Sequence, residues 1–135
     1  SDEVTRIELV TVQNLLNTTG KTVYVEKEEA IDGATAISGS GPAYVWHFMN
    51  EMLSAAQGMG FTYSEAELLV TQTFLGAVEL YNASDISLEE WIKRVCSKGG
   101  TTEAALRSFR NNEVGKDIHA GANAALQRAK ELGGE

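Results

Sequence analysis

The sequence is poor in several features on which whole classes of protein depend. Its 135 residues include one cysteine, which excludes a disulfide framework and a thiol-based metal site. Lysine and arginine number 11 against 19 aspartate and glutamate residues, and the formal charge of -8 argues against nucleic acid or an anionic membrane as partner. No apolar run approaches the ~20 residues of a membrane span, and the N-terminus has no signal-peptide pattern. We therefore expect a cytoplasmic protein that binds neither nucleic acid nor a membrane.

What the sequence does contain predicts a mainly all-α fold, a compact bundle of about six helices with one short strand near the N-terminus. Residues 4–18 carry apolar side chains at helical spacing, and Gly20 follows as a typical C-terminal residue. In residues 21–29, Val23 and Val25 lie between charged residues in an alternating pattern that predicts the strand. The single proline and the absence of repeats or low-complexity tracts fit one mainly helical domain.

A long apolar segment begins at Pro42. Proline is tolerated in the first turn of a helix, because its missing N–H has no intrahelical partner there. From Pro42 to about Gly60 the segment is apolar on almost every side. Such a helix is buried all round, so in a small chain we expect a partner subunit to cover part of it.

Capping-box patterns predict where the next two helices begin, since a serine followed three residues later by glutamate satisfies free N–H groups at a helix start. Two further helices are expected after a break at residues 97–100. The capping pairs are Ser64 with Glu67, before a helix that ends near Asn82, and Ser87 with Glu90, before a shorter helix.

The stretch Gly39–Ala43, GSGPA, resembles the start of a dinucleotide-binding fingerprint. That fingerprint needs a third glycine where this chain has Tyr44, and a βαβ unit that is not predicted here. We therefore expect no phosphate cradle. Gly39 and Gly41 would instead let a ligand approach the backbone at a helix start, where free N–H groups favour negative or electron-rich groups. A simple turn with Ser40 as helix cap explains the same residues.

A second glycine pair, Gly99 and Gly100, precedes Thr101 and Thr102 at another predicted helix start. Consecutive backbone N–H groups there form a nest for an anion, and the hydroxyl groups add directed hydrogen bonds. No Walker lysine pattern is present, so a small carboxylate suits the nest better than a triphosphate. Lys98 adds a cation beside it. A glycine turn with a threonine helix cap is again the alternative.

Other polar residues carry no recognisable site pattern, and we expect no metal site. Neither histidine has metal-ligand spacing, and the cysteine has no evident histidine and acid arranged around it. The acidic cluster fits a solvated turn. The residues to which no function is assigned are His47, His119, Cys96, Glu26, Glu28, Glu29 and Asp32.

Taken together, four motifs resemble, in order and spacing, the C-terminal domain of pyrroline-5-carboxylate reductase. They are ATAISGSGPAYVWHF, LLVTQTFLGAVEL, VCSKGGTTEAAL and AALQRAKELG. TGKTVYVEKEEAIDG is similar to the stretch that links the two domains of that family. The resemblance implies that residues 1–30 are an inter-domain helix and strand, and that residues 31–135 are a helical domain for dimerisation and substrate binding.

The resemblance also implies an activity. The family reduces the C=N bond of 1-pyrroline-5-carboxylate to L-proline with NADPH or NADH, in proline biosynthesis. Its N-terminal Rossmann domain holds the cofactor, and its helical domain interlocks with that of a second subunit, so a homodimer, or a higher oligomer of dimers, is expected.

The same resemblance implies roles for individual residues. Ser97, with the backbone of Gly99, Gly100 and Thr101, would bind the substrate carboxylate. Thr102 would be the catalytic residue that hydrogen-bonds the ring nitrogen. The residues expected beside the nicotinamide end of the cofactor are Gly39, Ser40, Gly41, Pro42 and Ala43.

Three departures from the family pattern are visible. Lys98 stands where the family usually has proline, and Asn50 where many members have an acidic residue. No strand–GxGxxG–helix unit occurs in the sequence, so we expect this chain alone to bind NAD(P)H poorly and to be inactive.

Three hypotheses follow. In the first, the chain, which opens on Ser1 without methionine, is part of a longer reductase. Alternatively, it is a stand-alone dimeric module that binds a small carboxylate such as proline without hydride chemistry. In the third hypothesis, it is a purely structural dimerisation domain in which both glycine stretches only cap helices.

Overall fold

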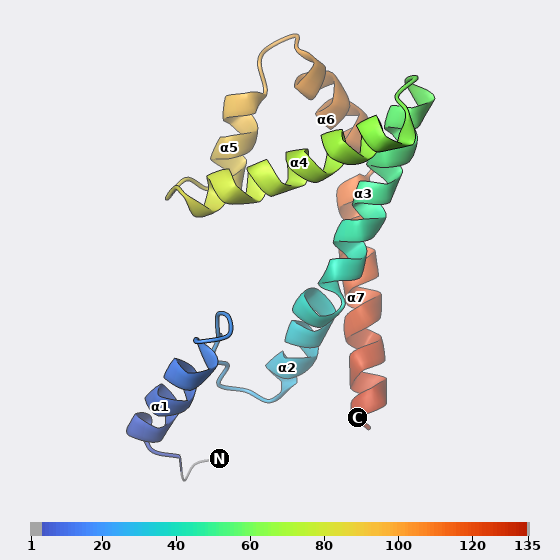
Figure 1. The fold of residues 1–135 in the computed structure, drawn as a ribbon. Coiled ribbons are helices and arrows are strands. Elements are labelled where there is room, and N and C mark those ends of the chain that lie inside the picture. The colour runs from blue at the N-terminus through green and yellow to red at the C-terminus, as the bar shows by residue number, and fades with distance from the viewer. Residues whose placement is uncertain (1–3, 135) are drawn as a thin grey trace.

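The computed structural model describes residues 4–134, and its regular elements are helical, as Figure 1 shows. The all-α prediction is therefore confirmed. In chain order the elements are α1 (Arg6–Leu16), α2 (Glu29–Ala34), the π-helical segment η1 (Thr35–Gly39), α3 (Gly41–Gly58), α4 (Tyr63–Asn82), α5 (Leu88–Val95), α6 (Thr101–Asn111) and α7 (Val114–Gly133).

The strand predicted in residues 21–29 is wrong. Residues 21–25 have no regular secondary structure, and no strand occurs anywhere in residues 4–134. Val23 is 85% exposed, and the N–H of Thr22 donates to the side chain of Asn17 at 3.0 Å rather than to a neighbouring strand. The alternating pattern had no second strand with which to form a ladder, so the segment stays unpaired.

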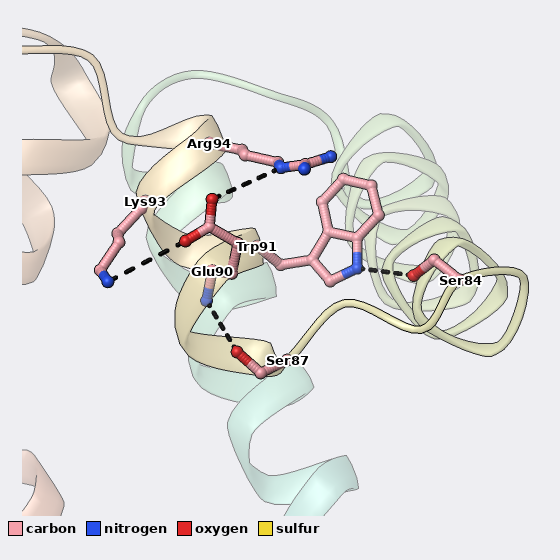
Figure 2. A network of polar contacts seen from close by, with 6 residues as sticks. All are labelled: Ser84, Ser87, Glu90, Trp91, Lys93 and Arg94. Atoms are coloured by element: carbon pink, nitrogen blue, oxygen red, sulfur yellow. Dashed lines mark hydrogen bonds and ion pairs between the residues drawn. The ribbon is translucent and has the colours of Figure 1, made fainter.

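Helix starts follow local capping, although one predicted start is shifted. α4 begins after Thr62, whose side chain and Glu65 form a reciprocal capping box, so the predicted pair Ser64 and Glu67 is wrong by two residues. Ser87 does cap α5, because its hydroxyl accepts from the N–H of Glu90 at 3.2 Å. The carboxylate of Glu90 lies instead near the cations of Lys93 and Arg94, as Figure 2 shows.

The small core lies where α4 crosses α3 and where α7 runs past η1 and α2 (Figure 1). The buried apolar residues are Ala36, Ala66 and Val70. Around the crossing, the ring of Phe48 makes edge-to-face contacts with Phe74 and Phe109, at centroid separations of 6.2 and 6.5 Å. Such pairs add directional packing to an otherwise thin core.

The single chain is unusually open. Its accessible surface is 11129 Å², whereas a compact monomer of 14.6 kDa exposes about 6,900 Å². Much of the excess is apolar, since Trp46 in α3 is 66% exposed and Ile7 in α1 is 80% exposed. The helix from Pro42, predicted to be buried all round, is thus largely uncovered within one chain.

Candidate functional site

The link between α5 and α6 is a tight turn at Ser97–Gly100. The N–H of Gly100 donates to the carbonyl of Ser97 at 3.0 Å, which closes the turn. Gly99 has a φ of 75°, in the left-handed region that a type II turn requires at its third position. Lys98 occupies the second position, where proline is favoured because its ring fixes φ.

Gly100 is needed for a different reason. A Cβ at this position would lie 2.4 Å from Oγ of Ser97 and 3.1 Å from its carbonyl oxygen. The Ser97 hydroxyl therefore lies directly against the backbone at the start of α6. Both glycines of the pair are required by the chain's own geometry.

α6 presents a helix N-terminus immediately after this turn. Its N-cap is Gly100, not a threonine, so the threonine-cap alternative is wrong. The first intrahelical bond runs from the N–H of Ala104 to the carbonyl of Gly100 at 3.2 Å. The preceding amides of Thr101 and Thr102 belong to the first turn, which has no intrahelical acceptor and attracts anions.

Glu103 belongs to the first turn of α6, although the sequence alone did not single it out as a site residue. Its carboxylate accepts from the N–H of Gly99 at 2.7 Å. A detectable signal was its position three residues after the N-cap Gly100, where a glutamate side chain reaches back over a helix start.

The first glycine stretch is not a loop. η1 runs to Gly39 and is closed by an i→i−5 bond from the N–H of Ser40 to the carbonyl of Thr35 at 2.9 Å. α3 follows at once, with Pro42 in its first turn as predicted. Ser40 occupies the N-cap position of α3, as the simple-turn alternative expects, although its side chain makes no capping hydrogen bond.

The glycines of this stretch are not required by the chain itself. Neither Gly39 nor Gly41 is among the residues with positive φ. A Cβ on Gly41 would meet nothing within 4 Å, and one on Gly39 would make only an ordinary contact with Thr35 at 3.8 Å. The surface at Gly41 is open, so a flat group outside this chain has room to approach the backbone.

Tyr44 fixes the shape of the π-helical segment. Its hydroxyl donates to the carbonyl of Ala36 at 3.0 Å in a partly buried hydrogen bond. Ala36 is itself only 2% exposed. The sequence offered no signal for this bond, because it joins residues eight apart across the change from π- to α-helix.

The two predicted site stretches are far apart in one chain. Figure 1 shows the start of α3 beside α2, whereas the α5–α6 turn lies near the opposite end of α3. The turn is held there by α5, which is tied to the end of α4: Nε1 of Trp91 donates to Oγ of Ser84 at 3.1 Å, as Figure 2 shows. The guanidinium of Arg94 lies 5.6 Å from the centre of the Trp91 ring.

A cleft of about 640 Å³ adjoins the start of α3. It is open to solvent between α3 and α7, and mostly apolar residues line it, including Ala43, Tyr44, Phe48, Met52 and Ile118. His47, Glu51 and Asp117 contribute its polar groups.

The remaining polar candidates form no site in the part of the chain that the structure describes. No group of three or more metal-ligating side chains occurs within residues 4–134. His119 and three of the four acidic residues at 26–32 are exposed, and Cys96 is a half-buried free thiol. In the same residues, none of the helices is long and apolar enough to span a membrane.

Comparison with known proteins supplies the family. The family model described as pyrroline-5-carboxylate reductase dimerisation matches residues 28–132, which include both glycine stretches. The chain belongs to this family. The resemblance inferred from the four motifs is therefore confirmed.

Relatives named pyrroline-5-carboxylate reductase match nearly the whole chain. The enzyme of Pseudomonas aeruginosa is 40% identical over 118 residues, which are 87% of this chain and 43% of that protein. Pyrroline-5-carboxylate reductase 2 of Bacillus subtilis is 35% identical over 132 residues, 98% of this chain and 47% of that protein. The chain thus spans less than half the length of these relatives.

Solved structures of the same name share the fold. The reductase of Coxiella burnetii superposes with a TM-score of 0.93 at 32% identity, covering 98% of this chain and 49% of that one. The enzyme of Plasmodium falciparum, solved with NADP bound, superposes with a TM-score of 0.86 at 31% identity, covering 98% and 50%.

Proposed function

We propose that this chain is the dimerisation and substrate-binding part of a pyrroline-5-carboxylate reductase. The reaction is reduction of the C=N bond of 1-pyrroline-5-carboxylate to L-proline with NADPH or NADH. The observation that carries the proposal is the family match over residues 28–132, together with a formed turn and helix start at Ser97–Thr102. The division at residue 30 and a cytoplasmic location belong to the same proposal.

The start of α6 suits the substrate's carboxylate. First-turn amides and the positive end of the helix dipole attract an anion, and the Ser97 hydroxyl lies against the same backbone. Lys98 is exposed beside the turn and adds a positive charge. This clamp would fix one end of the small ring.

Thr102 would then lie at the other end of the substrate ring. It is half-buried in the first turn of α6. Its hydroxyl would hydrogen-bond the ring nitrogen, orient the protonated imine and stabilise the amine as it forms. A protonated imine is already electrophilic, so positioning supplies most of the catalysis that the protein must provide.

The open backbone at Gly39–Ala43 fits the nicotinamide end of the cofactor. When bound, that cofactor supplies the hydride. A Cβ added to Gly41 would have no neighbouring atom within 4 Å, so a flat ring can approach without displacing a side chain. The phosphates would be held elsewhere, because this stretch lacks the dinucleotide fingerprint.

A homodimer is part of the proposal. The surface in excess of a compact monomer is about 4,200 Å² per chain, which is more than one partner buries in a typical obligate interface. The two proposed site stretches lie at different ends of α3 in one chain (Figure 1), so a complete site needs a second copy or a cofactor domain that spans them.

The test starts from the DNA upstream of the Ser1 codon. An open reading frame of on the order of 150 further residues with a strand–GxGxxG–helix unit supports the proposal. The whole protein should then oxidise NAD(P)H only in the presence of 1-pyrroline-5-carboxylate. A start codon immediately ahead of Ser1, or a whole protein without this activity, would overturn the reductase function and favour the non-catalytic module that binds a small carboxylate.

A further inference from the structure

A carboxylate from α6 contacts the Ser97–Gly100 turn, which is proposed to hold the substrate. Glu103 accepts from the N–H of Gly99 at 2.7 Å, a short distance typical of a hydrogen bond to an ionised group. This contact lies inside the stretch to which the proposed function assigns the substrate carboxylate. A role for Glu103 therefore rests on that function and refines it.

Other glutamates of this chain show what an ordinary cap looks like. Glu8 and Glu65 each lie three residues after an N-cap threonine and accept from that threonine's own N–H, at 2.9 and 2.8 Å. In both cases the threonine hydroxyl accepts in return from the glutamate N–H. These carboxylates secure the end of a helix.

Glu103 differs from them in its target. The N-cap of α6 is Gly100, which has no side chain to complete a box and whose N–H already donates to the Ser97 carbonyl. Glu103 reaches one residue further, to Gly99 in its left-handed conformation. Its bond therefore holds the turn that precedes the helix.

Two of the amides predicted to bind substrate are thus already engaged. Gly99 donates to Glu103, and Gly100 donates to Ser97. The amides of Thr101 and Thr102 precede the first intrahelical bond and point out of the helix start. Together with the Ser97 hydroxyl, they are the groups that would remain for the substrate's carboxylate.

Lys98 makes this bond more important. The second position of a type II turn favours proline, which fixes φ before the turn forms. Lysine leaves that angle free, so the turn needs another restraint. Glu103 provides one through its bond to the Gly99 amide.

We propose that Glu103 is a positioning residue: by binding the Gly99 amide it holds the Ser97–Gly100 turn in the shape that leaves the amides of Thr101 and Thr102 for the substrate's carboxylate. The opposing role, in which Glu103 competes with the substrate for the Gly99 amide, makes opposite predictions for the same variants.

The experiment uses the full-length reductase with 1-pyrroline-5-carboxylate as the varied substrate. Glu103→Ala removes the restraint and is expected to raise KM about five- to tenfold, the effect of one ordinary hydrogen bond at an exposed position. kcat should change less than about twofold, because the carboxylate clamp is the same in ground and transition states. Glu103→Gln keeps an acceptor oxygen and should stay within about threefold of the wild-type KM.

A second substitution distinguishes the role of Glu103 in holding the turn from an effect of its charge. In a Lys98→Pro background, Glu103→Ala should raise KM by less than about threefold relative to Lys98→Pro alone, since proline restrains the same turn. Glu65→Ala is the matched control, because it removes the same kind of bond at α4 and should leave KM unchanged. A lowered KM in Glu103→Gln or Glu103→Ala, an unchanged KM in Glu103→Ala, or the same rise in KM from Glu103→Ala with and without Lys98→Pro would each overturn the proposal.

Hydrogen–deuterium exchange of residues 97–102 in the same proteins tests positioning without turnover. Exchange should accelerate in Glu103→Ala and slow again with Lys98→Pro, whereas Glu65→Ala should leave it unchanged. If the wild-type protein has no reductase activity, the proposed function fails, and the exchange data still decide whether Glu103 holds the turn. Equal exchange in wild type and Glu103→Ala rejects the inference in either case.

Discussion

Thr102 is the single side chain on which the proposed chemistry depends most. It is half-buried one residue after the start of α6, next to the turn that would hold the substrate carboxylate. Thr102→Ala in the intact enzyme should lower kcat at least about tenfold, equivalent to about 1.4 kcal/mol of transition-state stabilisation. Steady-state kinetics with Thr102→Ser as control checks this, because serine retains the hydroxyl. An unchanged kcat in the alanine variant would refute the role of Thr102.

Glu65 gives a prediction about pH at the same scale. The side-chain hydrogen bond from Thr62, followed by the backbone one, lowers the pKa of Glu65 below its ordinary value of 4.5. A lowered pKa in the folded state favours folding above the ordinary value, and this contribution is lost as pH falls through the lowered value. Glu65→Gln should therefore be less stable than wild type near neutral pH, and the difference should shrink as the pH falls below 4.5.

Urea unfolding of both proteins across that range measures the effect. Glu8, whose pKa is lowered mainly by the backbone hydrogen bond from Thr5, should respond in the same direction when replaced by glutamine. A stability difference that stays constant with pH would show that the capping carboxylate is not what the substitution removes.

At the scale of elements, the change from η1 to α3 depends on one hydroxyl. Tyr44 donates to the carbonyl of Ala36, which lies inside the π-helical segment. Tyr44→Phe keeps the ring and should lower the free energy of unfolding by about 1 kcal/mol, the net value of a partly buried hydrogen bond.

Tyr63→Phe is the matched control for this measurement. The Tyr63 hydroxyl donates to Glu67 at 3.3 Å on an exposed face of α4, and its loss should cost less than about 0.5 kcal/mol. Equal losses in the two variants, by urea denaturation, would mean that the bond to Ala36 does not stabilise η1.

Helix positions were predictable where the signal is local. Ser87 caps α5 as its spacing indicates, and Pro42 lies in the first turn of α3. The pair Ser64 and Glu67 fails because Thr62 and Glu65 have the same spacing two residues earlier and form the reciprocal box. Local patterns identify that a helix begins, but neighbouring matches compete for the same start.

At the scale of the whole molecule, the chain exposes too much apolar surface to be complete by itself. Trp46 on α3 is 66% exposed, and large aromatic residues of this kind dominate binding at interfaces. Sedimentation of the protein should therefore show a homodimer. Trp46→Glu should weaken dimerisation at least about thirtyfold, corresponding to a hot-spot loss of about 2 kcal/mol.

Asn50→Glu is the control for that change. It adds the same charge to the same helix, at a position where the family often has an acidic residue, and it should leave the dimer intact. A monodisperse wild-type monomer would contradict the proposed assembly. Equal dissociation of the two variants would show that charge on α3, rather than loss of the Trp46 ring, disrupts the dimer.

The sequence by itself determined the helical class and identified the residues proposed for the site, because helix spacing, capping and glycine pairs act over a few neighbouring residues. It did not determine the fate of residues 21–25, since a strand exists only where a partner strand lies beside it. Nor did it reveal the bond from Tyr44 to Ala36, or that Glu103 engages the Gly99 amide. Those features depend on where the chain places atoms across a turn or a change of helix type. Only the tertiary structure decided that the two glycine stretches lie at different ends of α3. That separation is set by where α4 crosses α3 and by the path that α5 takes from the end of α4 (Figure 1).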